Sequence, residues 1–360
     1  MNKKIIFSAG GTGGHILPAI NLMKHFSDRG YEVLIVTDNR GSNFIKSYSQ
    51  FKSYILKSDT PTNKNLLRKF IAFFIIINSI IKSLIILKKE KPDLIFGLGG
   101  YVSFPISFAS KFLNLPLVIY ENNLIFGRAN KYLSFISKKI FLAKKISINT
   151  HKLSNKKIYE VGPILNKNII NNRIAKKNNK EIFTIIVLGG SQGAEIFGKI
   201  IPQVIKKIKD EGCKIKIIQQ CILSQRKEIE NFYNQNYINN YIFEFEENLA
   251  ELISSADLGI TRCGASTTAE FAYMFTPFIA VPLPNSIDNH QYLNARYYEK
   301  EGCCWLLEQN KFNEKNLYNL VLKVMKNKST LEDIQKNMEK KFKYDAYSSI
   351  EKEVKEFIKV

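Results

Sequence analysis

The sequence predicts an α/β protein with a parallel β-sheet in each half of the chain. Short apolar, β-branched runs alternate with stretches of helical spacing, which is the pattern of βαβ units. The opening run of each half, 3–8 and 182–188, leads directly into a glycine turn. A length of 360 residues suffices for two domains of ordinary size.

The expected elements follow in order along the chain. Strands are expected in the first half at 3–8, 32–37, 93–96, 117–120, 140–143 and 158–161, and in the second half at 182–188, 214–219, 241–245, 257–260 and 278–281. Composition shifts to Asn and Lys after 161, so we expect domains at 1–161 and 162–340. The charged tail carries apolar residues at near-helical intervals, which predicts one or two closing helices.

Composition limits the classes of function. The net charge of +21 favours an anionic partner, but lysine is spread along the whole chain, so we expect no nucleic-acid binding. The five cysteines form no C-x-x-C pair and only four histidines occur, which favours reduced thiols without a metal site. Too few apolar residues precede the first glycines for a signal peptide, so we expect an intracellular protein.

The segment 65–89 is an unusually apolar helix. At about 100° per residue, Asn65, Arg68, Ser79, Lys82 and Ser83 share one side, and large apolar residues occupy the other. Lys82 interrupts what would otherwise resemble a transmembrane run. Two interpretations stay open, a helix lying on an anionic membrane surface and a crossover helix packed on the sheet.

Two glycine loops carry the clearest chemistry. The first, Gly10-Gly11-Thr12-Gly13-Gly14-His15, can aim backbone N–H groups at an anion and adds an imidazole as a candidate acid or base. The second, 189–193, can hold a phosphate with its N–H groups and the Ser191 hydroxyl. Neither loop has the pattern of a P-loop or of a dinucleotide fingerprint, which argues against an ATPase and a dehydrogenase.

Two later segments suit a nucleotide sugar. The small residues of 261–270 permit close approach at a helix start, and Glu270 can accept hydrogen bonds from ribose hydroxyls. The alternative for Glu270 is a first-turn carboxylate stabilised by the helix dipole. The amides and imidazole of 288–295 suit sugar hydroxyls, although a polar helix start explains them equally.

Taken in order, six motifs make a specific series: Gly-Gly-Thr-Gly-Gly-His, Gly-Leu-Gly-Gly-Tyr-Val-Ser, Tyr-Glu-Asn-Asn, Gly-Gly-Ser-Gln-Gly-Ala, Arg-Cys-Gly-Ala-Ser-Thr-Thr-Ala-Glu and Asp-Asn-His-Gln-Tyr-Leu-Asn-Ala. This series resembles the MurG family of N-acetylglucosaminyltransferases over nearly the whole chain. The resemblance implies a GT-B fold, in which two Rossmann-like domains face a cleft and a C-terminal helix at 341–360 packs back on the N-terminal domain.

The resemblance also implies the reaction and its place. UDP-N-acetylglucosamine (UDP-GlcNAc) would be the donor and undecaprenyl-linked lipid I the acceptor, giving lipid II for peptidoglycan synthesis at the cytoplasmic face of the inner membrane. The enzyme would be peripheral, with other cell-wall synthesis proteins as possible partners. GT-B enzymes generally need no metal or cofactor, and none is expected here.

Site residues are carried over by position. Glu270 would bind the ribose, Ser191 the diphosphate and Gln291 the GlcNAc, while His15 is our hypothesis for the general base, because histidine titrates near neutrality. The full set of expected donor contacts is Thr12, Gly13, Gly14, Asn123, Ser191, Ala265, Ser266, Thr267, Thr268, Ala269, Glu270 and Gln291.

The chain departs from the family pattern at four positions. Asn166 stands where the family has an arginine, so that contact is not carried over. Glu246 replaces an apolar residue, His290 a glutamine and Leu124 a glycine. Two other activities remain as alternatives, a GT-B glycosyltransferase that acts on diacylglycerol and a UDP-GlcNAc 2-epimerase.

Overall fold

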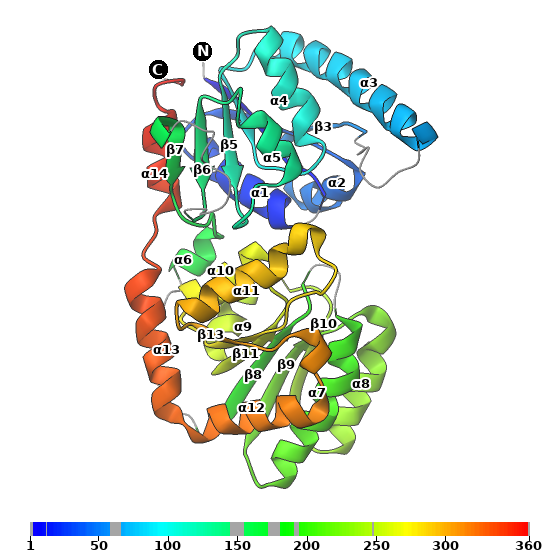
Figure 1. Ribbon diagram of the computed structural model, residues 1–360, viewed down its shortest axis with the longest axis vertical. Helices are drawn as coiled ribbons and strands as arrows, with labels where there is room; N and C mark the ends of the chain where they lie inside the picture. The colour runs from blue at the N-terminus through cyan, green and yellow to red at the C-terminus, as the bar shows by residue number, and fades with distance from the viewer. Residues whose placement is uncertain are drawn as a thin grey trace. The chain divides into compact units, whose positions relative to one another are not determined.

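The chain folds into two compact α/β units. The computed structural model describes residues 3–11, 13–57, 66–144, 155–171, 181–190, 194–246 and 248–358. Unit 1 consists of Met1–Asn166 together with Tyr344–Val360, and unit 2 is Lys167–Lys343. The first boundary therefore follows Asn166, and the chain returns to unit 1 for its last segment (Figure 1).

Unit 1 contains a seven-stranded parallel sheet in the order β3-β2-β1-β4-β5-β6-β7. Its strands are β1 (Lys4–Ser8), β2 (Glu32–Thr37), β3 (Lys52–Ile55), β4 (Leu94–Gly97), β5 (Leu117–Glu121), β6 (Lys139–Leu142) and β7 (Ile158–Glu160). Its helices are α1 (Gly13–Ser27), α2 (Asn39–Ile45), α3 (Leu66–Glu90), α4 (Ser103–Phe112), α5 (Arg128–Leu133) and α14 (Ala346–Val354), with short 3₁₀ turns at Lys46–Tyr48 and Asn155–Lys157.

The central strands of unit 1 are continuous apolar runs because both faces of a parallel sheet are covered. Ile6 of β1 lies in register with Leu34 of β2 on one side and with Ile95 of β4 on the other. The strand order reverses between β1 and β4, so the loops that follow these two strands lie side by side. Such a reversal is where open α/β sheets bind ligands.

Unit 2 contains a six-stranded parallel sheet in the order β10-β9-β8-β11-β12-β13. Its strands are β8 (Phe183–Leu188), β9 (Ile215–Gln220), β10 (Asn239–Phe243), β11 (Leu258–Thr261), β12 (Phe278–Ala280) and β13 (Cys304–Leu306). Its helices are α6 (Lys167–Asn171), α7 (Glu195–Asp210), α8 (Leu223–Gln235), α9 (Leu249–Ser255), α10 (Ala265–Tyr273), α11 (His290–Lys300), α12 (Glu314–Lys326) and α13 (Lys328–Lys341), with 3₁₀ turns at Ile287–Asn289 and Gln309–Lys311.

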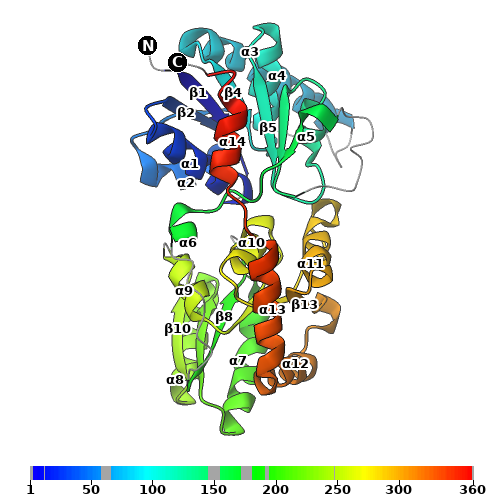
Figure 2. The ribbon, with the colours of Figure 1, turned by 90° about the vertical axis from the view of Figure 1, so that its left-hand side faces the viewer.

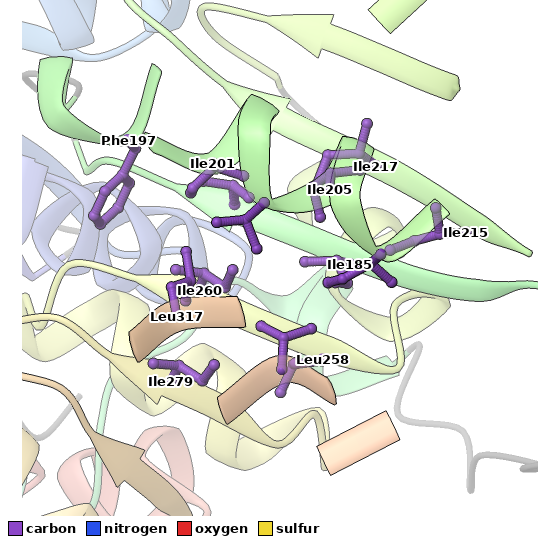
Figure 3. Close-up of a cluster of buried hydrophobic side chains, with 14 of the residues drawn as sticks. Ile185, Phe197, Ile201, Ile205, Ile215, Ile217, Leu258, Ile260, Ile279 and Leu317 are labelled. Atoms are coloured by element: carbon purple, nitrogen blue, oxygen red, sulfur yellow. The ribbon is translucent and has the colours of Figure 1, made fainter. Parts of the chain in front are cut away.

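The core of unit 2 forms where α7 covers the sheet. Phe197, Ile201 and Ile205 recur at helical spacing and are buried. Figure 3 shows these side chains directed toward Ile185 of β8 and Ile260 of β11. Burial of apolar surface on this scale is the main force that stabilises the unit.

The sequence did not predict β3 and β13, which are edge strands. β3 has the residues Lys52-Ser53-Tyr54-Ile55 and is largely exposed. β13 has only three residues. An edge strand pairs on one side only and needs no continuous apolar run, so β3 lacks the pattern that indicates central strands. The residues of β13 are apolar, but the strand is too short to stand out in the sequence.

The helix α14 packs on unit 1. Glu351 accepts a hydrogen bond from His25 Nε2 at 3.1 Å and forms an ion pair with Arg29 at 2.7 Å. Lys139 of β6 forms an ion pair with Glu353 at 2.7 Å. Figure 2 shows α14 lying along unit 1 and α13 lying along unit 2.

Helix α3 packs on unit 1 along one side and is exposed along the other. Ser79 and Ser83 are buried on the inner side, where Ile86 and Leu87 join the core of the unit, and the Ser79 hydroxyl donates to the Lys57 carbonyl at 2.6 Å. This side packs on α4 (Figure 1). The outward side, which we call the apolar face of α3, consists of Phe70, Ile71, Phe73, Phe74, Ile77, Ile81 and Ile85.

Candidate functional site

The first glycine loop connects β1 to α1. Gly13, Gly14 and His15 form the first turn of α1, while Thr12 lies outside the described residues. Gly11 has φ +84°, in the left-handed region that glycine enters at little cost. The loop therefore depends on glycine for its path and ends by presenting His15 at the start of a helix.

The glycine loop that follows β4 packs directly on the first. The Gly10 N–H donates to the Gly99 carbonyl at 3.2 Å. A Cβ added to Gly100 would lie 2.4 Å from the Gly10 carbonyl oxygen, and one added to Gly99 would lie 2.8 Å from His15 Nδ1. The backbone of the loop after β4 thus packs against the imidazole of His15 and restricts its orientation.

Asn123 belongs to a third loop of unit 1, held by Glu121 at the end of β5. Glu121 is fully buried, and its Oε1 accepts from the Asn123 N–H at 3.0 Å and from Asn123 Nδ2 at 3.2 Å. Its Oε2 accepts from the Gly127 N–H at 2.8 Å and from Asn130 Nδ2 at 3.0 Å. One carboxylate therefore sets the course of 123–130. Sequence reasoning gave Glu121 no role, although its place directly after a strand was visible.

A second buried carboxylate of unit 1 was also missed. Asp38 follows β2, and its side chain accepts hydrogen bonds from the Gly11 and Gly41 N–H groups. The gap of 27 residues between Asp38 and Gly11 hides this contact in the sequence.

The segment predicted to bind ribose in unit 2 is helix α10. The helix begins at Ala265, and its N-cap residue is Gly264, which has no side chain that could cap the helix. The first N–H groups of α10 can therefore be offered to an anion. Ser266 and Thr267 are partly exposed in that turn, whereas Thr268 and Ala269 are buried. The Thr268 hydroxyl donates to the Gly264 carbonyl at 3.0 Å, which stabilises the turn itself.

Glu270 lies in the second turn of α10, so the alternative of a first-turn carboxylate stabilised by the dipole does not hold. Burial raises the pKa of Glu270 to about 7. A carboxylate in such surroundings gains from hydrogen-bond donors, and ribose hydroxyls are donors of the right kind.

Gln291 joins two loops of unit 2 from the first turn of α11. Its Oε1 accepts from the Cys263 N–H at 3.1 Å and from the Leu283 N–H at 3.0 Å. Asn294, one turn further along, donates to the Cys263 carbonyl at 3.0 Å. Both hydrogen-bonding groups of the Cys263 backbone are therefore fixed by α11, directly before the start of α10. Sequence reasoning placed Asn294 among the amides that suit sugar hydroxyls, whereas its side chain donates to the backbone.

Arg262 completes this polar frame. Its guanidinium is buried, lies 4.9 Å from the Phe197 ring centroid, and donates to the carbonyls of Val281 at 3.2 Å and Pro282 at 3.3 Å. It also donates to Gln309 Oε1 at 2.6 Å, and burial lowers its pKa. These bonds tie the end of β11 to the end of β12.

Other expected site residues are placed as follows. Ser191 lies outside the described residues, so its role in holding the diphosphate stays a prediction. Glu246 accepts from the Tyr241 hydroxyl at 2.7 Å and from the Asn248 N–H at 2.9 Å. His290 Nδ1 lies 2.7 Å from the Ile287 carbonyl oxygen.

Comparison with known proteins identifies the family. Residues 5–142 match the N-terminal domain of glycosyltransferase family 28, and residues 184–350 match its C-terminal domain. A Rickettsia canadensis protein named UDP-N-acetylglucosamine–N-acetylmuramyl-(pentapeptide) pyrophosphoryl-undecaprenol N-acetylglucosamine transferase is 37% identical, over 95% of this chain and 96% of its own. The chain belongs to the MurG family. A Pelagibacter ubique member with the same name is 36% identical over 96% of this chain and 95% of its own.

Solved structures confirm the GT-B fold that the MurG resemblance implied. Acinetobacter baumannii MurG superposes with a TM-score of 0.79 at 24% identity, over 98% of this chain and 99% of that one. The UDP-GlcNAc 2-epimerase of Neisseria meningitidis superposes with a TM-score of 0.68 at 14% identity, over 98% of this chain and 100% of that one. Likeness at these identities concerns the fold, and the MurG family rests on the sequence relatives.

Proposed function

We propose that this chain transfers GlcNAc from UDP-GlcNAc to the C4 hydroxyl of MurNAc in lipid I and so produces lipid II. The observation that carries the proposal is the 36–37% identity, over almost the full length, to relatives named for this transfer. Peptidoglycan precursors would then be its substrates and its product.

The donor-binding part of the proposal rests on unit 2. The start of α10, which has no side-chain cap, and the raised pKa of Glu270 suit a nucleotide sugar, with the ribose hydroxyls donating to Glu270. Gln291 uses its oxygen within the protein, which leaves its Nε2 group as the donor available to GlcNAc. Together with the Ser191 loop, these groups would orient the donor.

The chemical step needs a base and charge stabilisation. The MurNAc hydroxyl attacks the anomeric carbon with inversion, His15 takes the hydroxyl proton, and UDP leaves. We propose that helix and loop N–H groups stabilise the growing charge on UDP without a metal. Transfer should therefore persist in excess EDTA, and His15→Ala should lower kcat with saturating substrates by at least about tenfold.

The decisive experiment measures transfer of labelled GlcNAc from UDP-GlcNAc to a lipid I analogue and, separately, to diacylglycerol. Label in a product in which GlcNAc is joined to the MurNAc of the lipid I analogue supports the proposal. Label only in diacylglycerol, or UDP-ManNAc formed without any acceptor, would replace it with one of the two alternatives. The epimerase is favoured by fold likeness alone, at 14% identity.

We also propose that the enzyme works as a peripheral protein on the cytoplasmic face of the inner membrane. The apolar face of α3 is exposed, and Lys82, Lys88 and Lys89 lie exposed on the same helix, as an anionic lipid surface requires. By length and composition alone Phe70–Glu90 could also cross a membrane, but its inner side packs on α4.

Liposome binding tests the membrane proposal. A Phe73→Ser, Phe74→Ser double variant should bind vesicles of anionic lipid at least about tenfold more weakly, because two largely exposed rings are lost from the contact. Phe245→Ser removes an even more exposed ring from unit 2 and serves as the control. Equal binding of both variants to vesicles would contradict the proposal. Association with other cell-wall synthesis proteins stays a prediction.

A further inference from the structure

Asp38 occupies a junction between two loops of unit 1. It follows the last residue of β2 and forms the N-cap of α2, with φ −99° and ψ 177°. It is 7% exposed. As an N-cap it accepts from the Gly41 N–H through Oδ1 at 2.8 Å, which is the usual task of aspartate at this position.

Capping α2 does not explain the second contact of this carboxylate. The Gly11 N–H donates to Oδ1 at 3.2 Å and to Oδ2 at 3.1 Å, so both oxygens face the first glycine loop. Arg40 lies beside the same loop, with Nη2 3.6 Å from Oδ2. Asp38 therefore joins the start of α2 to the loop that precedes α1.

The first glycine loop is thereby held at two consecutive residues, by the segments that follow the two strands on either side of β1. Gly10 is bound to Gly99 after β4, and Gly11 is bound to Asp38 after β2. Glycine has more backbone freedom than any other residue, so a path through Gly10 and Gly11 needs external contacts to stay in one conformation. Hydrogen bonds to a charged group are about twice as strong as neutral ones and suit this purpose.

We propose that Asp38 is a positioning residue for GlcNAc transfer, which holds the Gly11 peptide and through it the first turn of α1 that carries His15. The inference rests on the proposed function. It also limits how the loop can bind a diphosphate. The Gly11 N–H faces a carboxylate, so an anion has to use other groups of the loop, such as the N–H groups at the start of α1.

Two substitutions separate the two tasks of Asp38. Asp38→Ser keeps a good N-cap for α2, but its side chain is too short to reach Gly11 as well. Asp38→Asn keeps a carbonyl oxygen at the position of Oδ1, which accepts from both Gly41 and Gly11, but loses the second acceptor for Gly11 at Oδ2. The matched control is Asp345→Ser, because Asp345 caps α14 in the same unit by accepting from the Ser348 N–H at 3.0 Å.

Kinetics with a lipid I analogue should split between kcat and KM. We expect Asp38→Ser to lower kcat by about tenfold or more, with the KM for UDP-GlcNAc changed by less than about twofold. Asp38→Asn should restore part of that loss, and Asp345→Ser should leave kcat unaffected. An undiminished kcat in Asp38→Ser, an equal loss in Asp38→Asn, or a change in KM alone would overturn the proposal.

Amide hydrogen exchange gives a readout that needs no substrate. The peptide containing Gly10, Gly11 and His15 should exchange faster in Asp38→Ser than in Asp38→Asn, while α2 keeps its protection in both. Unchanged exchange in that peptide would refute the positioning role even in an active enzyme. Unfolding of Asp38→Ser under conditions where Asp345→Ser stays folded would make Asp38 a residue of general stability and would also overturn it. A wild type that transfers no GlcNAc would refute the proposed function, and exchange would still report whether Asp38 holds the loop.

Discussion

The raised pKa of Glu270 predicts that donor binding depends on pH, given the proposed role of Glu270 in holding the ribose. With a pKa of about 7, the carboxyl is mostly protonated at pH 6 and mostly ionised at pH 8. Only the ionised form can accept a hydrogen bond from each ribose hydroxyl through both oxygens. The ionised fraction rises about tenfold between pH 6 and pH 8, so the affinity for UDP-GlcNAc should rise by about the same factor.

Calorimetric titration of UDP-GlcNAc without acceptor measures this dependence directly. The diphosphate of UDP-GlcNAc carries no proton that titrates near neutrality, so the ligand itself adds no pH dependence to the affinity. Glu270→Gln should bind about tenfold or more weakly at pH 8 and should show no pH dependence. His15→Gln and His290→Gln control for the imidazoles and should keep the pH dependence. A wild-type affinity that does not change with pH, or a pH dependence of affinity that persists in Glu270→Gln, would refute the role of Glu270 in binding ribose.

The same pKa has a consequence for stability. The folded pKa of about 7 lies above the ordinary value of 4.5, so the folded protein holds this proton more tightly than the unfolded chain. The stabilisation is full below pH 4.5 and is lost as the pH rises through 7. Glu270→Gln, which cannot ionise, should therefore gain at most about 3 kcal/mol in the free energy of unfolding at pH 8. Urea denaturation at pH 5 and pH 8 measures this gain.

Three further predictions concern unit 1. Gly99 has φ +98°, and Gly99→Ala would place a methyl group against His15. The kcat of transfer should therefore fall about tenfold to hundredfold, and reversion at Gly99 alone should restore it. Glu90 is buried, and despite that burial hydrogen bonds from Lys52, Tyr54 and Lys4 lower its pKa to about 2. Its contribution is full above pH 4.5 and is lost toward pH 2, so Glu90→Gln should cost about 3 kcal/mol at pH 7 and much less at pH 2.5 by urea denaturation. Tyr120→Phe leaves the Ile164 N–H, now 3.1 Å from the Tyr120 hydroxyl, without its acceptor, and should lower the free energy of unfolding by about 1–3 kcal/mol; an unchanged urea midpoint would contradict this.

Contiguous motifs made the local structure around several candidate site residues predictable. The path of the first glycine loop follows from adjacent glycines, and the place of Glu270 follows from its distance to Gly264, because both depend on local structure alone. Asp38 could not be found in this way. Its contact with Gly11 exists only because β2 and β1 are neighbours in the sheet, and strand order is a property of the whole unit.

The orientation of α3 shows a second limit of sequence reasoning. Periodicity identified two sides of this helix, but it does not say which side faces the protein. Ser79 and Ser83 pack inward on α4 since small side chains allow close helix contact, and the large side chains of the apolar face of α3 remain outside. A pattern gives the faces of a helix, whereas its neighbours decide which face is buried.

The division of unit 1 into two segments determines when it can be completed. During synthesis, the whole of Lys167–Lys343 is made before α14 leaves the ribosome. Until then Lys139 lacks Glu353, and Arg29 lacks Glu351, so the first unit to emerge is the last to be finished. A protease cut between α13 and α14 would therefore damage the unit that carries His15, although the cut lies at the opposite end of the sequence.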